Sequence, residues 1–212
     1  MRFYGQFDPP VDKYLYETFF FERNEPGFFV ECGAFDGEFE SSCKLFEESF
    51  GWKGVNIEAS PVLFPLLQQR RPDSLNLNMA LSDHCGTATF RHVSDAVHGE
   101  FLGWGSIDHR PEQEEVIVGE SMTVTEHTVR TWTWRNLTEL QSQDSIELFV
   151  LDVEGHELAV IDGMTDSKVL PGLICVEHTQ VEPEILTEAL DSLGYRFHSS
   201  LHVNSFYLRQ TD

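Results

Sequence analysis

The sequence lacks the features of a membrane or secreted protein. No apolar run approaches the roughly 20 residues that a membrane-spanning helix needs. No basic segment followed by an apolar stretch stands at the N-terminus, so we expect no signal peptide. The four cysteines are scattered and form no Cys-x-x-Cys pair, which favours a reducing compartment over a disulfide framework. Together these absences predict a cytoplasmic protein.

Positive charge is also scarce. The 212 residues include 14 Lys and Arg against 36 Asp and Glu, which gives a formal net charge of −22. A surface this acidic repels phosphate backbones and anionic lipids, so we expect neither a nucleic acid nor a membrane as partner. The charge does not identify a substrate, because adaptation to solubility or high salt would give the same composition. At this length, residues 1–212 are expected to form a single domain.

Two phosphate-binding motifs are missing as well. The dinucleotide fingerprint Gly-x-Gly-x-x-Gly needs glycines at the positions where Phe35 and Glu38 follow Gly33. The middle glycine of that fingerprint makes room for a pyrophosphate. The Gly-Lys-Ser/Thr sequence of a Walker loop is also absent. The sequence therefore disfavours a nucleotide-dependent oxidoreductase.

The chain does contain a strand and glycine-loop unit that is typical of nucleoside binding. The pattern at residues 28–37 predicts a buried parallel strand and a Gly-x-x-x-Gly loop, and residues 53–58 predict a second strand. Glu58 ends this second strand and is placed to accept hydrogen bonds from ribose hydroxyls. Glu31 and Asp36 flank the loop and suit a cationic ligand without phosphates, such as S-adenosylmethionine. The alternative is an ordinary strand–turn–helix corner with two solvated acids.

A second cluster of polar residues follows the apolar strand predicted at residues 146–152. Ligands of open α/β sheets bind at the carboxyl ends of the strands. Asp152 could hold the ammonium group of the cofactor, and Glu154, His156 or His178 could take a proton from an acceptor hydroxyl. The structural alternative is that these residues begin a helix, where the positive end of the helix dipole stabilises the acidic side chains.

A metal site is a further alternative at the same strand ends. Asp152, Glu177 and His178 end two neighbouring strands, and oxygen and imidazole ligands suit a divalent cation. A buried strand-end histidine is more often hydrogen-bonded than bound to a metal. A divalent metal is therefore the less favoured interpretation, and we expect no metal ligands.

Alternating strand and helix patterns predict a mostly parallel sheet with right-handed crossovers. Residues 1–26 are expected to form an N-terminal helical segment over the sheet edge or the cofactor mouth. Residues 75–81 are expected to form one strand, and residues 94–122 a loop on the substrate side. The pattern at residues 195–208 predicts a hairpin that adds an antiparallel edge to the sheet.

Four motifs occur in order along the chain, at residues 29–37, 51–61, 80–83 and 151–157. Together they resemble the FkbM family of S-adenosylmethionine-dependent methyltransferases, over roughly residues 10–180. The resemblance implies the α/β class I methyltransferase fold. In that fold a Rossmann-like three-layer sandwich surrounds a mostly parallel seven-stranded sheet with a C-terminal antiparallel hairpin.

The resemblance also implies an activity and a set of site residues. The expected reaction is O-methylation of a hydroxyl on a sugar or a small natural product, with S-adenosyl-L-methionine as cofactor and S-adenosyl-L-homocysteine as product. The expected cofactor-binding residues are Glu31, Gly33, Ala34, Asp36, Gly37, Ser41, Glu58, Ala59, Ser60, Ala80, Leu81 and Asp152. The expected catalytic residues are Glu154, His156 and His178.

Two features depart from the usual pattern of that family. Cys32 stands where a small or apolar residue is common, and the segment 94–122 is not typical, which leaves the acceptor open. The expected partner is a small-molecule or glycan acceptor, and the chain could form a homodimer. The main rival function is a catalytically inactive binding protein with this fold. Such a protein would have a damaged cofactor loop, whereas the loop of this chain is intact.

Overall fold

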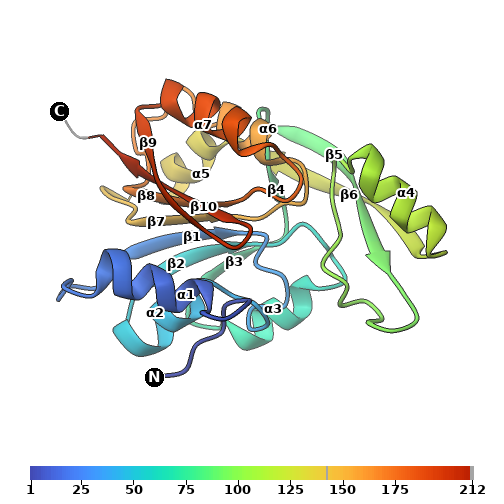
Figure 1. Ribbon diagram of the computed structural model, residues 1–212, viewed down its shortest axis with the longest axis horizontal. Coiled ribbons are helices and arrows are strands. Elements are labelled where there is room, and N and C mark those ends of the chain that lie inside the picture. Colours follow the sequence, from blue (N-terminus) through green and yellow to red (C-terminus); the bar gives the residue numbers. More distant parts are fainter. Residues whose placement is uncertain (142, 211–212) are drawn as a thin grey trace.

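A computed structural model describes residues 1–141 and 143–210 of the chain, and a seven-stranded sheet forms its centre (Figure 1). The strands are β1 (Phe28–Cys32), β2 (Lys53–Ile57), β3 (Leu75–Leu77), β7 (Leu148–Leu151), β8 (Leu173–Glu177), β9 (Tyr195–Leu201) and β10 (Asn204–Arg209). Their order is β3-β2-β1-β7-β8-β10-β9. The first five strands in this order are parallel, and β10 runs antiparallel to both of its neighbours. The predicted mostly parallel sheet with a C-terminal hairpin is confirmed.

Helices cover both faces of this sheet, so the central strands are apolar on both sides. Successive residues of a strand face opposite sides, and Phe29 and Val30 accordingly belong to two different core clusters. The helices on the Val30 side are α5 (Trp134–Gln141), α6 (Glu157–Asp162) and α7 (Pro183–Ser192). Those on the other side are α1 (Val11–Leu15), α2 (Lys44–Phe50) and α3 (Phe64–Arg70) (Figure 1). The predicted three layers are confirmed, and no helix of the described residues has the length and hydrophobicity to cross a bilayer.

The N-terminal segment contains a helix that begins at Val11. Regular α geometry spans α1, and a π-helical turn, Tyr16–Phe20, continues it. Leu15 is fully buried, and the Phe20 ring meets the Trp52 ring edge-on at a centroid distance of 4.9 Å. The helix therefore packs on a face of the sheet, and it also reaches the edge strand β9, where the Tyr14 hydroxyl lies 2.9 Å from Oγ of Ser199.

A second, three-stranded sheet stands beside the central one. It consists of β4 (Ala80–Leu81), β5 (Gly86–Ser94) and β6 (Thr123–Trp132), in the order β4-β6-β5. The single strand predicted at residues 75–81 is therefore wrong, since β3 and β4 belong to different sheets. Asn78 lies between them, and its side-chain amide donates to the backbone oxygens of Glu58 and Ala59, at 2.8 and 3.2 Å. These contacts hold the chain where it leaves the central sheet.

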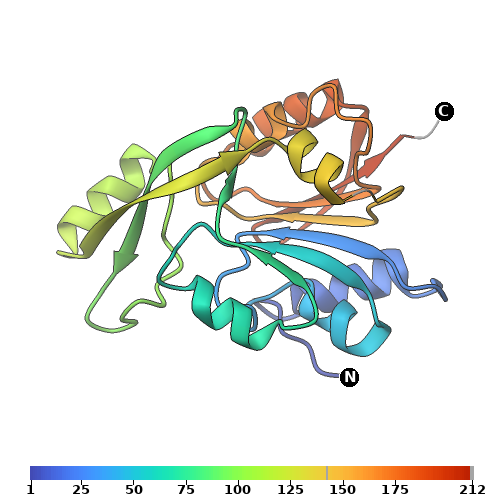
Figure 2. The same ribbon diagram turned by 180° about the vertical axis from the view of Figure 1, so that it is seen from behind.

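Residues 94–122 are not wholly a loop, because they contain the helix α4 (Pro111–Gly119). The backbone N–H of Arg110 donates to the side-chain oxygen of Gln113 at 2.9 Å and closes the first turn. The sequence pattern missed this helix because its apolar side chains do not form one buried stripe. We name residues 95–110, which precede the helix, the arm. The small sheet and α4 project from one side of the molecule (Figure 2).

Candidate active site

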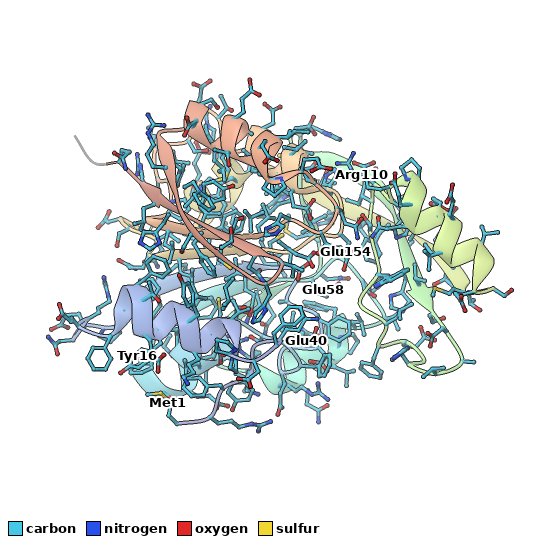
Figure 3. The ribbon with its side chains drawn as sticks, viewed as in Figure 1. Met1, Tyr16, Glu40, Glu58, Arg110 and Glu154 are labelled. Carbon is cyan, nitrogen blue, oxygen red and sulfur yellow. The ribbon has the colours of Figure 1, made fainter. Side chains whose placement is uncertain are left out.

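A cavity of about 400 Å³ opens where the parallel strands of the central sheet reach their carboxyl ends. The ends of β1, β2, β7 and β8 form its floor, and β5 and the arm border one side. This is the edge at which open α/β sheets bind their ligands. Figure 3 shows Glu40, Glu58 and Glu154 gathered at this edge. The cavity is therefore the candidate active site.

The structure brings most of the residues predicted from the sequence to this cavity. Those that line it are Gly33, Ala34, Ser41, Glu58, Ala59, Ala80, Leu81, Asp152, Glu154 and His156. Those that lie outside its lining are Glu31, Asp36, Gly37, Ser60 and His178. The strand-end acids of β2 and β7 thus meet in one place, whereas the acid within β1 does not join them.

The floor of the cavity depends on Gly33, which follows β1 directly. Its φ is 87°, and a Cβ at this position would lie 1.7 Å from the backbone oxygen of Asp152. The N–H groups of Gly33 and Ala34 both donate to the backbone oxygen of Ile57, at 3.0 Å. Only glycine fits this turn, because any other residue would add both strain and a clash. The chain segments after β1 and β7 can therefore approach each other closely and leave room for a ligand beside the backbone.

Two of the carboxylates predicted to touch the cofactor are paired inside the protein instead. Glu31 is buried, accepts the backbone N–H of Ser42 at 2.8 Å, and forms an ion pair with Arg71 at 3.1 Å. Asp36 is also buried and forms an ion pair with Arg70. Both arginines lie at the end of α3. These pairs hold the loop after β1 in place from behind, so they shape the cavity without facing it.

Glu58 faces the cavity from the end of β2 and is firmly anchored. Its two carboxylate oxygens accept the backbone N–H groups of Phe35, at 2.8 Å, and Ser60, at 2.7 Å. Burial raises the pKa of Glu58 to about 7. Each carboxylate oxygen has a second lone pair. The group can therefore still accept a hydrogen bond from a ligand hydroxyl, as ribose recognition requires.

Three carboxyl groups meet on the floor beside β7 and β8. Oxygens of Asp152, Glu154 and Glu177 lie within 4.8 Å of one another. Asp152 is open to the cavity but surrounded by protein, and this enclosure, followed by the charges of Glu177 and Glu154, raises its pKa well above the ordinary value. Such a group suits an organic cation or a divalent metal ion. His178 takes no part in it, because its Nδ1 lies 3.0 Å from the hydroxyl oxygen of Ser205.

Glu154 is held by the amides of two glutamines. Its Oε2 accepts hydrogen bonds from Nε2 of Gln113, at 3.0 Å, and from Nε2 of Gln180, at 3.4 Å. Burial, followed by the charge of Glu177, raises the pKa of Glu154 to about 8. Gln113 is buried and belongs to α4, so the helix missed by sequence analysis reaches the site directly. A held carboxylate that titrates near neutrality can act as a general base.

His156 borders the cavity, but both of its ring nitrogens are engaged. Nδ1 lies 2.6 Å from a carboxylate oxygen of Asp108 in the arm, and Nε2 lies 3.1 Å from the hydroxyl oxygen of Ser82. Ser82 directly follows Leu81, which lines the cavity. This arrangement favours a positioning role for His156 over a role as proton acceptor.

His92 makes an equivalent bridge on the other side of the arm. Its Nε2 lies 2.8 Å from a carboxylate oxygen of Glu100, and its Nδ1 lies 3.0 Å from the hydroxyl oxygen of Ser60. The Ser60 hydroxyl also accepts the backbone N–H groups that begin the turn before α3. The Ser60 hydroxyl is therefore already hydrogen-bonded within the protein. The arm residues that line the cavity are Phe101, Leu102, Gly103, Trp104, Gly105 and Ile107.

Several lining residues were missed by the sequence analysis. They are Gln6, Phe7, Glu40, Thr179, Gln180 and Val203, and Gln113 supports the site from behind. Each is a single residue in a loop or at a helix start, with no local motif around it. Only the fold brings them to the same cavity, so the sequence carries no signal that could have found them.

Comparisons with known proteins agree with this geometry. The family model for the methyltransferase FkbM domain matches residues 31–197. Among solved structures, the METTL16 MTase domain superposes with a TM-score of 0.53 at 9% identity, over 95% of this chain and 66% of that domain. A putative methyltransferase, yhhF from Escherichia coli, gives a TM-score of 0.46 at 11% identity, over 95% of this chain and 87% of that one. A search of curated proteins found no significant match.

The likeness to the METTL16 domain supports the fold and goes no further. The chain spans slightly less than two thirds of the METTL16 domain, and at 9% identity the match shows a shared fold alone. Together with the observed strand order, it confirms the class I methyltransferase fold.

Proposed function

Because the chain belongs to the FkbM methyltransferase family, we propose that it methylates a hydroxyl of a sugar or a small natural product, with S-adenosylmethionine as methyl donor. One observation carries the proposal: an anchored acid at the end of β2 and a group of acids after β7 share one cavity. The net charge of −22 supports a small-molecule or glycan acceptor over a nucleic acid or a membrane.

The residues present fit the proposed cofactor. Glu58 would accept hydrogen bonds from the ribose hydroxyls, Asp152 would face the ammonium group, and Gly33 would leave the backbone accessible beside the ligand. No Lys or Arg of the described chain lines the cavity, which suits a nucleoside without phosphates. Ala80 and Leu81 would border the adenine. Bound S-adenosylmethionine supplies a methyl group that is activated by a positively charged sulfur.

The chain's own residues would contribute alignment and a base. A cavity that fixes two reactants relative to each other can supply about 7–11 kcal/mol of a reaction barrier. We infer that Glu154 takes the proton of the acceptor hydroxyl, because it faces the cavity and its pKa is raised to about 8. A positioned base of this kind is worth roughly 10²–10⁴-fold in rate. Gln113 and Gln180 would keep its carboxylate oriented.

Calorimetry with S-adenosylhomocysteine tests the cofactor assignment, and micromolar binding is expected. Labelled S-adenosylmethionine, offered with the small-molecule fraction of a cell extract, then tests methyl transfer. Glu154→Gln keeps the shape of the side chain and should lower turnover by about 10²–10⁴-fold with little effect on cofactor binding. His178→Ala is the matched control, because His178 lies outside the cavity lining. No binding of the nucleoside, or equal turnover in all variants, would contradict the proposal.

The catalytically inactive alternative receives less support from the structure. In a catalytically inactive protein we would expect the loop after β1 to be altered, or one of the strand-end acids to be replaced. Gly33, Glu58 and Asp152 instead all face the cavity. If the unsubstituted protein, with Glu154 in place, binds the nucleoside but transfers no methyl group, the inactive alternative is favoured.

A further inference from the structure

One end of the cavity is built from three segments that are distant in sequence. Gln6 and Phe7 belong to the N-terminal segment, Glu40 to the loop after β1, and Glu177 and Gln180 to the end of β8 and the turn beyond it. We name these five residues the acceptor subsite. Glu177 and Gln180 adjoin the carboxylate of Glu154, and none of the five residues is needed for the proposed contacts of the cofactor.

A buried acid fixes the N-terminal part of this subsite. The carboxylate of Asp12 is fully buried and accepts the backbone N–H groups of Tyr4, at 2.7 Å, and Gly5, at 3.1 Å. Gly5 in turn pairs with Glu40 in an isolated parallel bridge. The backbone directly before Gln6 is therefore held by contacts within the protein.

Neither carboxylate of the subsite, that of Glu40 or that of Glu177, has a counter-charge within the part of the chain that the structure describes. By contrast, the buried carboxylate of Glu31 forms an ion pair with Arg71 at 3.1 Å, although the chain contains only 14 Lys and Arg residues. Around Glu40 and Glu177 the described residues supply no ion pair with Lys or Arg, and none lines the cavity. In addition, Oε2 of Glu177 is buried without a hydrogen-bond partner among the described residues. Burying such an oxygen unpaired is costly.

The charge of Glu177 also acts on Glu40, which lines the same cavity. Glu40 is accessible to solvent, yet the protein around it raises its pKa, and the charge of Glu177 adds to this effect. A positive ligand placed between them would relieve both the repulsion and the unpaired oxygen. A negative ligand would meet two carboxylates and no Lys or Arg side chain of the residues described, and like charges brought together at a binding site are strongly unfavourable.

We propose that the acceptor subsite binds an ammonium group of the methyl acceptor, so that the substrate is an amino alcohol or an amino sugar whose hydroxyl reaches Glu154. The inference rests on the proposed methyl transfer and narrows its substrate class. An ammonium offers three N–H donors, and its hydrogen bonds to Glu40 and Glu177 would be charge-assisted and short. The ring of Phe7 provides an aromatic surface beside the cation. The ammonium of the cofactor does not fill this role, because Asp152 is its expected partner.

The test uses the full chain saturated with S-adenosylhomocysteine and measures ligand affinity by saturation-transfer NMR. Two pairs each compare an ammonium compound with a neutral analogue: glucosamine with N-acetylglucosamine, and 2-aminocyclohexanol with cyclohexane-1,2-diol. Each amine should bind roughly tenfold more tightly than its neutral partner, and glucosamine 6-phosphate should bind more weakly than glucosamine. Glu40→Gln and Glu177→Gln keep the side-chain shape and should each reduce the preference for the amine. Glu184→Gln, at an exposed position of α7, is the matched control and should keep it.

The other possible results separate the ammonium subsite from the methyl transfer on which it rests. Equal affinity within both pairs, no binding of any probe, or tighter binding of the phosphate would overturn the ammonium subsite while leaving methyl transfer intact. Binding of Mg²⁺ in place of the amines would show that the carboxylates hold a metal, which also overturns it. Failure of S-adenosylhomocysteine to bind would be a different outcome, because it would remove the proposed function on which the subsite depends.

Discussion

Gly33 offers a direct test of how the cavity floor is built. In Gly33→Ala the new methyl carbon would lie 1.7 Å from the backbone oxygen of Asp152, and the alanine would have to keep a φ of 87°. The left-handed backbone costs a non-glycine residue about 1–2 kcal/mol. Moving packed backbone to relieve the overlap costs a further 1–3 kcal/mol, approximately. The free energy of unfolding should therefore fall by about 2–5 kcal/mol.

Gly51→Ala is the matched control for this substitution. Gly51 also has a positive φ, 66°, but a Cβ there meets nothing within 4 Å, so only the backbone cost applies. For a chain of this size, each kcal/mol lowers the melting temperature by about 2–4 °C. Gly33→Ala should thus melt about 2–12 °C below Gly51→Ala, and only Gly33→Ala should lose affinity for S-adenosylhomocysteine. Equal melting temperatures and equal affinities in the two variants would refute the role assigned to this close approach.

Three further substitutions test other parts of the structure. Arg71→Met should lower the free energy of unfolding by about 3–5 kcal/mol, because it leaves a buried carboxylate without its counter-charge. Arg135→Met, in an exposed ion pair, should leave the chemical denaturation midpoint nearly unchanged, and a similar loss in both would be inconsistent with this reasoning. Folding raises the pKa of Glu58 from 4.5 to about 7, so the stability that this proton contributes is present at low pH and is lost as the pH rises through about 7. Glu58→Gln should accordingly flatten the pH dependence of the melting temperature between about pH 4.5 and 7, and an unaltered slope would count against it. Gln113→Glu keeps an acceptor for the backbone N–H at the start of α4 but removes the amide donor, so the pKa of Glu154 should rise above about 8. An NMR titration of the side-chain carboxyl carbon measures this pKa, and a fall would disprove the contact.

The central sheet and its strand-end acids could be predicted because each is a local pattern. A parallel strand covered on both faces is an uninterrupted apolar run, and such runs precede both Glu58 and Asp152. The position of an acid directly after a parallel strand places it at the carboxyl edge of the sheet. The prediction that these two residues share one site therefore needed no knowledge of long-range contacts.

Contacts between distant segments could not be predicted in this way. Glu31 has the same local pattern as a ligand-binding acid, but Arg71, forty residues later in the chain, neutralises it inside the protein. His178 and Glu177 are adjacent, yet successive strand residues face opposite sides. Glu177 consequently lines the cavity, whereas His178 turns toward the hydroxyl of Ser205. The helix α4 escaped prediction because it buries few apolar side chains.

The two histidine bridges of the arm also affect how ligands would enter and leave. His92 and His156 each join an arm carboxylate to a serine that directly follows a residue of the cavity wall. If the arm moved outward, each imidazole would lose its contact with the arm carboxylate. Of its two contacts, each imidazole would then keep only the one to the serine hydroxyl. The cavity wall at Ala59 and Leu81 would then lose this outer support. Any displacement of the arm would therefore open the cavity on the side proposed for the adenine.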